Sequence, residues 1–151
     1  MGELYHSIEI EAPKAFVYAL LSNLESVADY NPLVEHARYV SEKLTGPGAS
    51  RECSLGKHGI VRERVIDSVE GFSISMEVFE HKWPIEYFRW TTTLEEMAGK
   101  TNLTQFTEYQ LKFGILGYIM DKLIVNRIMA KQIENILTGM RSHISKHCNF
   151  S

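Results

Sequence analysis

One long helical segment near the end of the chain constrains the fold more than any other feature. Residues 115–146, ILGYIMDKLIVNRIMAKQIENILTGMRSHISK, contain no proline and carry apolar residues at helical spacing. At 1.5 Å per residue the predicted helix is about 45 Å long, well beyond the usual ~10–14 residues. A helix of this length in a chain of 151 residues needs a large surface to lie against.

The apolar pattern differs between the two halves of this helix. The second half has a single apolar stripe, typical of a helix docked on a sheet, formed by Met129, Ile133, Ile136, Leu137, Met140 and Ile144. The first half is apolar on almost every side, and the stripe extended backwards places Lys122 and Asn126 on the inward face. Because a packed core disfavours such groups, we expect this half to face a space with polar contents. Alternatively, the helix bends or rotates near Ala130 and Lys122 reaches out to solvent.

The rest of the chain predicts seven strands and two short helices. Residues 3–11 alternate between apolar and polar side chains, as in a half-buried strand, and Pro13 then opens a helix that a second short helix at 24–29 follows. Turn signals separate six further strands, at about 34–43, 50–55, 60–69, 72–81, 85–95 and 101–113. Short connections favour an antiparallel meander, and twist curves such a sheet. We therefore predict a single α+β domain over 1–151, in which a curved seven-stranded antiparallel sheet wraps around the long C-terminal helix.

Composition excludes several classes of function. A hydrophobic content of 44% and a charged content of 23% are typical of a soluble globular protein. The net charge of −3 and the absence of a Lys/Arg cluster predict neither nucleic-acid binding nor contact with an anionic membrane surface. No run approaches the ~18 apolar residues of a membrane span, and the first residues do not resemble a signal peptide. We therefore expect a cytoplasmic protein in which Cys53 and Cys148 are reduced thiols.

The sequence lacks recognisable catalytic and cofactor motifs. It contains no serine nucleophile elbow, phosphate-binding loop or dinucleotide fingerprint. His143, His147 and Cys148 have a spacing that could bind zinc, but they lie in the last helical turns, where histidine interacts favourably with the helix dipole. We expect no metal and no cofactor.

Aromatic residues, methionines and a few polar residues are candidates to line a pocket. The predicted ligand-binding residues are Tyr30, Met76, Phe79, Phe88, Trp90, Tyr109, Met120, Lys122, Leu123 and Asn126. Asn126 or Lys122, together with Tyr109, is expected to orient the polar end of the bound molecule, because an unpaired buried donor disfavours the wrong ligand.

Several stretches also carry a family resemblance. They are IEIEAP at 8–13, VYALL at 17–21, YNP at 30–32, GILG at 114–117 and LIV at 123–125. With the order of elements, they make the chain resemble the helix-grip superfamily of START-related and pollen-allergen-like domains, and within it the bacterial polyketide cyclase/dehydrase and lipid-transport group. The resemblance implies a hydrophobic cavity between sheet and long helix. Loops 56–59 and 80–84 match in position the loops that close over the ligand in the superfamily's plant hormone receptors.

The sequence thus favours binding of a small or medium hydrophobic molecule, such as a lipid, a polyketide or an isoprenoid-like compound. One alternative is a polyketide aromatase/cyclase or dehydratase, in which His6, Arg62, Glu63 or Tyr109 acts as general acid or base. Another is a protein-interaction module that uses the apolar start of the long helix, which could also form a homodimer.

Overall fold

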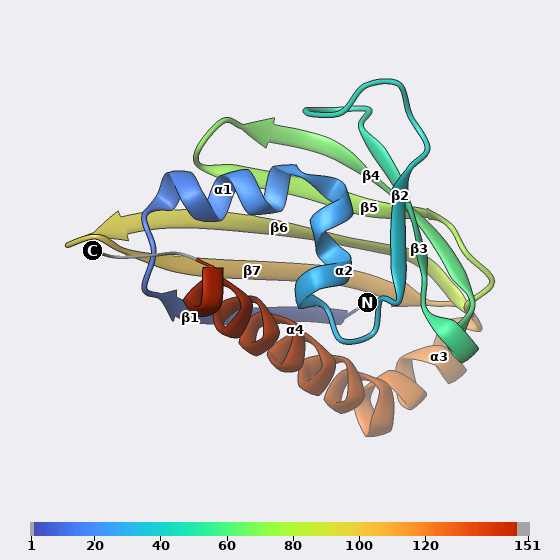
Figure 1. Cartoon of the computed structure of the whole chain (residues 1–151). Helices are drawn as coiled ribbons and strands as arrows, with labels where there is room; N and C mark the ends of the chain where they lie inside the picture. Colours follow the sequence, from blue (N-terminus) through green and yellow to red (C-terminus); the bar gives the residue numbers. More distant parts are fainter. Residues whose placement is uncertain (1, 148–151) are drawn as a thin grey trace.

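A curved antiparallel sheet holds one long helix on its concave face in the computed structural model, which describes residues 2–147 (Figure 1). Strand β1 (Gly2–Ile10) precedes α1 (Lys14–Ser22), η1 (Leu24–Ser26) and α2 (Val27–Tyr30). The remaining strands are β2 (His36–Tyr39), β3 (Ser50–Ser54), β4 (Ile60–Val69), β5 (Ser73–Glu80), β6 (Ile85–Met97) and β7 (Lys100–Leu111), with η2 (Gly56–His58) before β4. The final segment comprises α3 (Gly114–Met120), the π-turn η3 (Asp121–Val125) and α4 (Asn126–His147).

The strand order is β1-β7-β6-β5-β4-β3-β2, so β2 to β7 form the predicted meander. The first strand, β1, pairs antiparallel with β7, from Gly2 opposite Tyr109 to Ile10 opposite Thr101. The predicted fold class is confirmed, with seven strands, two short helical regions after β1 and one long C-terminal helix. Strand β2 is shorter than predicted, because Ser41 Oγ accepts a hydrogen bond from Ser50 N (2.8 Å) and donates one to Lys43 O (2.6 Å), which turns the chain.

The second half of the long helix is fixed to the sheet as its apolar stripe predicts. Ile133, Leu137, Met140 and Ile144 are buried in one core cluster with residues of β1, α1, α2 and the central strands. Gly139 permits a close approach between helices, since a Cβ atom there would overlap the carbonyl oxygen of Tyr30 in α2. The contact between α2 and α4 therefore depends on a residue without a side chain.

The first half of the long helix departs from the pattern expected of a regular helix. The irregularity lies at the π-turn η3, not near Ala130. A π-turn accommodates one residue more than an α-helical turn, so its own first residues and every residue before them are rotated relative to the stripe of α4. As a result Asp121 is buried and Lys122 is exposed, with its Nζ atom 5.1 Å from the centre of the Tyr118 ring. No helix within residues 2–147 is long and apolar enough to cross a bilayer.

Replacing Ile133 with alanine should destabilise the fold, whereas the same change at Ile128 should not. Ile133 is 3% exposed and Ile128 is 53% exposed on the same helix. Removing a buried isoleucine costs about 2–5 kcal/mol through lost burial and the cavity left behind. Urea unfolding of both variants measures the difference, and equal midpoints would show that the buried face of α4 is assigned incorrectly.

Candidate ligand-binding cavity

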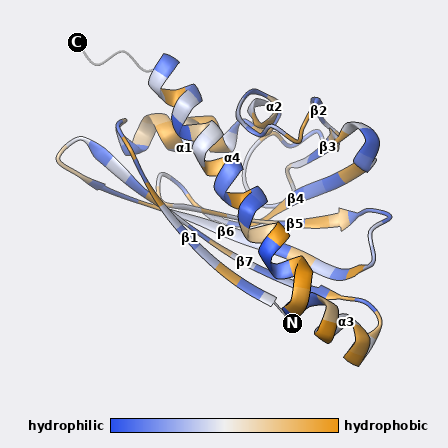
Figure 2. Cartoon of the chain, turned by 90° about the horizontal axis from the view of Figure 1, so that it is seen from below, coloured by the Kyte–Doolittle hydropathy of each residue, from blue (hydrophilic) through white to orange (hydrophobic). Residues whose placement is uncertain are grey.

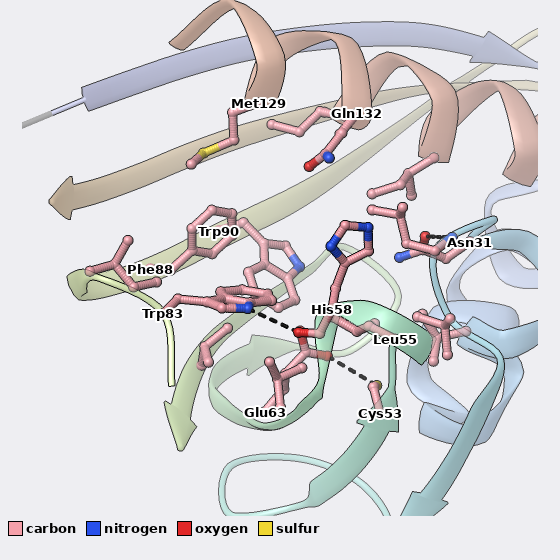
Figure 3. A pocket seen from close by; sticks show the side chains of 18 of the residues that line it. Asn31, Cys53, Leu55, His58, Glu63, Trp83, Phe88, Trp90, Met129 and Gln132 are labelled. Atoms are coloured by element: carbon pink, nitrogen blue, oxygen red, sulfur yellow. Dashed lines mark hydrogen bonds between the residues drawn. The ribbon is translucent and has the colours of Figure 1, made fainter. Parts of the chain in front are cut away.

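A cavity of about 410 Å³ lies between the concave face of the sheet and the long helix (Figure 3). Its wall is formed mainly by apolar and aromatic side chains from α2, the central strands, the loop before β6 and the inner face of the helix. Among them are Val27, Val61, Val78, Ile85, Phe88, Trp90, Met129, Ile133 and Ile136. The cavity occupies the region where the helix, fixed through its second half, is separated from the curved sheet.

A buried ion pair forms a polar patch on this wall. Arg51 Nε donates a hydrogen bond to Glu63 Oε1 at 2.7 Å, and Arg51 Nη1 donates another to the Leu24 carbonyl at 3.1 Å. The Cys53 thiol donates to the same Glu63 oxygen at 3.6 Å. Arg51 and Cys53 are two residues apart in β3, so their side chains point to the same face of the sheet. Glu63 of β4 lies opposite Arg51 in the register and points to that face as well, so all three side chains face inward.

Burial changes the acid–base properties of this patch. It raises the pKa of the Cys53 thiol to about 12, with the Glu63 carboxylate acting in the same direction. Burial also raises the pKa of the Tyr30 hydroxyl, which lies beside Arg51. For Arg51, burial alone would lower the pKa, but the Glu63 carboxylate outweighs it and raises the pKa above its ordinary value. At neutral pH the patch therefore contains a charged guanidinium, a neutral thiol and a neutral phenol.

Two loops meet at one side of the cavity. Trp83 Nε1, in the loop between β5 and β6, donates a hydrogen bond to the His58 carbonyl of η2 at 3.3 Å (Figure 3). Trp83 N also donates to His81 Nδ1 at 3.1 Å. His58, Trp83 and Pro84 all line the cavity. Loops 56–59 and 80–84, which were singled out from the sequence, are therefore joined to each other at the cavity wall.

A second polar group joins the start of the long helix to β7. The Tyr109 hydroxyl donates a short hydrogen bond to the Asp121 carboxylate, and Asn126 Nδ2 donates to the Tyr109 hydroxyl oxygen at 3.0 Å. Burial, followed by the bond to Asp121, raises the pKa of Tyr109. None of the three residues lines the cavity. Their polar groups hydrogen-bond to one another beneath the π-turn, and these bonds position the helix.

The structure places four of the ten predicted ligand-binding residues on the cavity wall, namely Tyr30, Phe88, Trp90 and Met120. Met76 faces inward but belongs to a separate core cluster with Leu24, Ala49, Val65 and Ile74. The expected inward position of Phe79 is wrong by strand parity: Val78 faces the cavity, and Phe79 lies outside with the Arg64 Cζ atom 5.0 Å from its ring centre. Tyr109 and Asn126 form the group beneath the π-turn, whereas Lys122 and Leu123 are exposed.

Sequence reasoning missed the ion pair as part of the wall. Because neighbouring residues of a strand alternate faces, the run Arg62-Glu63-Arg64 must direct at least one charge inward, but the run alone does not indicate which one. Val61 and Val65 are buried on either side of Glu63, so their two-residue spacing was the signal that could have identified it. Arg62 instead pairs with Glu52 and Glu80 on the outer face. Asn31 and Gln132, which also line the cavity, carried no comparable signal.

The other residues considered for chemistry are dispersed. Of His6, Arg62, Glu63 and Tyr109, only Glu63 lines the cavity. His6 is half-buried on β1, and its Nδ1 atom has no hydrogen-bond partner among the described residues. The rings of His143 and His147 stack with centres 4.3 Å apart, and Cys148 lies outside the described residues. Within residues 2–147, no group of three or more His, Cys, Asp or Glu side chains could hold a metal ion.

Comparison with known proteins places this geometry in a family. Residues 1–144 match the family described as polyketide cyclase/dehydrase and lipid transport. No curated protein matches the sequence of the chain.

Solved structures share the fold at low sequence identity. A protein of Thermus thermophilus is 20% identical with a TM-score of 0.79, over 98% of this chain and all of the other. A START superfamily protein of Mycobacterium smegmatis is 10% identical with a TM-score of 0.78, over 95% and 97% of the two chains. The di-domain ARO/CYC protein BexL of the BE-7585A biosynthetic pathway is 15% identical with a TM-score of 0.78, over 96% of this chain but only 47% of BexL. The fold is therefore the helix-grip fold.

Replacing Glu63 alone should destabilise the protein more than replacing the whole ion pair. The Glu63→Leu variant leaves the buried Arg51 guanidinium without its partner, which costs about 3–5 kcal/mol. The double variant Arg51→Met/Glu63→Leu removes both charges and should recover most of that loss. Urea unfolding of the two variants measures the coupling. A double variant no more stable than Glu63→Leu would contradict this account.

The Cys53 thiol should react slowly in the folded protein. With a pKa of about 12, its thiolate fraction at pH 8 is about a thousandfold below that of an ordinary thiol, and only the thiolate attacks alkylating agents. In a Cys148→Ser background, iodoacetamide should modify Cys53 at least about a hundredfold faster in urea than under native conditions. Similar rates in the two conditions would show that the thiol is neither buried nor shifted.

Proposed function

Because this chain belongs to the polyketide cyclase/dehydrase and lipid transport family, we propose that it binds a small or medium hydrophobic molecule between the sheet and α4. The observation that carries the proposal is the cavity itself, with a volume of about 410 Å³ and a mainly apolar wall. Small-molecule sites typically have volumes of about 300–1,000 Å³ and a few placed polar groups. Lipids, polyketides and isoprenoid-like compounds have the matching chemistry.

Three amide side chains line the cavity, namely Asn31, Gln105 and Gln132. Gln105 Nε2 already donates a hydrogen bond to Thr107 Oγ1 at 3.3 Å, so the other two are better suited to orient a polar end of the ligand. Asn31 follows α2 and Gln132 lies on α4, and both are on the cavity wall (Figure 3). The guanidinium of Arg51 is already engaged by Glu63 and by the Leu24 carbonyl. Asn31 Oδ1 accepts a hydrogen bond from Leu33 N at 3.0 Å, so Asn31 can offer the ligand its Nδ2 donor. We therefore assign selectivity to Asn31 Nδ2 and to Gln132, in place of the Asn126, Lys122 and Tyr109 set expected from the sequence.

Cyclase or dehydratase chemistry is the second candidate function. One observation favours it, namely that a carboxylate, Glu63, lies on the cavity wall with a thiol beside it. However, Glu63 Oε1 accepts hydrogen bonds from both Arg51 and Cys53, and the other three proposed acid–base residues lie elsewhere. Binding without turnover is therefore the function that the geometry supports better.

A bulky residue within the cavity should prevent ligand binding. Met129 lines the cavity, whereas its neighbour Ile128 does not and is 53% exposed. The Met129→Trp variant should lower the affinity for cis-parinaric acid, an apolar fluorescent probe, at least about tenfold, because the added ring occupies the volume that the probe needs. The Ile128→Trp variant adds the same ring outside the cavity and should bind as the wild type does.

Native mass spectrometry provides the stoichiometry, with one probe molecule expected per chain. Unchanged binding by Met129→Trp, in a variant that melts like the wild type, would place the probe outside the cavity and refute the proposal. Retained binding with loss of preference between apolar alcohols and acids in Asn31→Leu or Gln132→Leu would support the assigned orientation.

A further inference from the structure

An uncovered apolar surface lies beside the cavity. We define the apolar collar as the exposed large apolar residues of α3, η3 and the first turn of α4, with Phe113 just before them. They are Phe113, Ile115, Leu116, Tyr118, Ile119, Met120, Leu123, Ile124 and Ile128. Figure 2 shows the strongly hydrophobic colour concentrated on this part of the long helix, in contrast to the mixed surface of the rest of α4. Ile115 is 81% exposed, and a continuous apolar surface of this kind usually marks an interaction site.

The charges around the collar are positive. Between residues 112 and 127 the basic residues are Lys112, Lys122 and Arg127, and all three are exposed. The single acidic residue of this segment, Asp121, is buried and accepts the Tyr109 hydrogen bond. The segment is thus basic in a chain whose net charge is −3. The neighbouring loops 56–59 and 80–84 add Lys57 and Lys82. Two exposed carboxylates lie nearby, Glu80, which pairs with Arg62, and Glu86 in the first part of β6.

The collar is also continuous with the cavity. Phe113, Gly117, Met120 and Val125 belong to the same segment as the collar and line the cavity. Gly117 lets α3 fold back closely on the end of β7, because a Cβ atom there would overlap the Lys112 carbonyl. Phe113 is 65% exposed and Met120 is 45% exposed although both line the cavity, so the cavity reaches the surface at the collar. A hydrophobic molecule could pass between the collar and the cavity with little exposure to water.

We propose that the apolar collar docks this protein on an anionic lipid bilayer, with the opening of the cavity against the membrane. Exposed apolar side chains flanked by Lys and Arg have the composition of a helix that lies in a membrane interface. Each basic residue near an anionic leaflet strengthens binding by about fivefold. This revises the expectation from the sequence that no anionic surface is contacted, because the three basic residues are exposed on the segment that also carries the exposed apolar side chains. The proposal depends on the proposed function only for the ligand that would enter.

A second copy of the chain fits the collar less well. A symmetric dimer through the long helix would place Lys112, Lys122 and Arg127 of one copy near the same residues of the other. No exposed carboxylate of residues 112–127 would compensate that repulsion. A bilayer containing anionic lipids supplies both the apolar layer and the opposite charge.

Co-sedimentation with vesicles tests the docking. The wild type should bind vesicles of phosphatidylcholine and phosphatidylserine at about 7:3, and binding should weaken at least about tenfold in pure phosphatidylcholine. The Ile115→Asp variant, and independently Lys122→Glu/Arg127→Glu, should each lower binding at least about tenfold. Met97→Asp is the matched control, because Met97 is 83% exposed at the turn between β6 and β7, far from the collar, and should bind as the wild type does.

Three outcomes would overturn the proposal. The first is failure of the wild type to bind anionic vesicles. The second is a loss of vesicle binding in Met97→Asp as large as that in Ile115→Asp. The third is a concentration-dependent dimer that Ile115→Asp dissociates, in a protein that does not bind vesicles. Met129→Trp separates this inference from the proposed function, since it should lose probe binding in solution but retain vesicle binding. A thermal melt of each variant confirms that reduced binding does not arise from unfolding.

Discussion

The packing of one half of a long helix against a curved sheet is the contact on which the rest of the structure depends. Ile133, Leu137, Met140 and Ile144 fix α4 to the concave face, and Gly139 brings it against α2. The helix α4 curves at most gently, whereas the sheet is twisted and strongly curved. The two surfaces can therefore match along only part of the helix. The cavity on the inner side and the apolar collar on the outer side both follow from that mismatch.

The unfixed half of the helix requires its own anchor, which the π-turn provides. With its wider turn, η3 directs the carboxylate of its first residue, Asp121, to the Tyr109 hydroxyl of β7, and Asn126 completes the group. This anchor holds the helix near β7 without filling the space between them. The only ion pair with two largely buried side chains, among those described within residues 2–147, lies across the cavity at Arg51 and Glu63. Polar contacts thus position both sides of the cavity and leave its centre apolar.

The sequence predicted the architecture well because the architecture depends on periodicity. Alternation along strands and the stripe of α4 are local patterns, and both lead to the observed layers. The residues of the cavity wall were less predictable. They depend on which residues of a short strand face inward and on how the first half of the helix is rotated about its axis. Phe79 and Met76 could not both face inward with an odd spacing, and Val78 occupies the position expected for Phe79. Because of the π-turn, Asp121 is buried where Lys122 was expected to face inward, and Lys122 is exposed. The residue types in 121–125 do not indicate a π-turn.

Stability alone does not account for the arrangement at this end of the molecule. Filling the space beside Met129 and Trp90 would bury more apolar surface, and polar residues at Ile115 or Leu116 would remove exposed apolar area without loss of core contacts. The chain has neither feature, although the second half of the same helix has a polar outer face. An unfilled cavity and an uncovered apolar surface occur together on one segment, which also supplies residues to the opening between them. Because the cavity and the apolar collar meet on one segment, together they provide a route by which an apolar molecule moves between a bilayer and the interior of the protein.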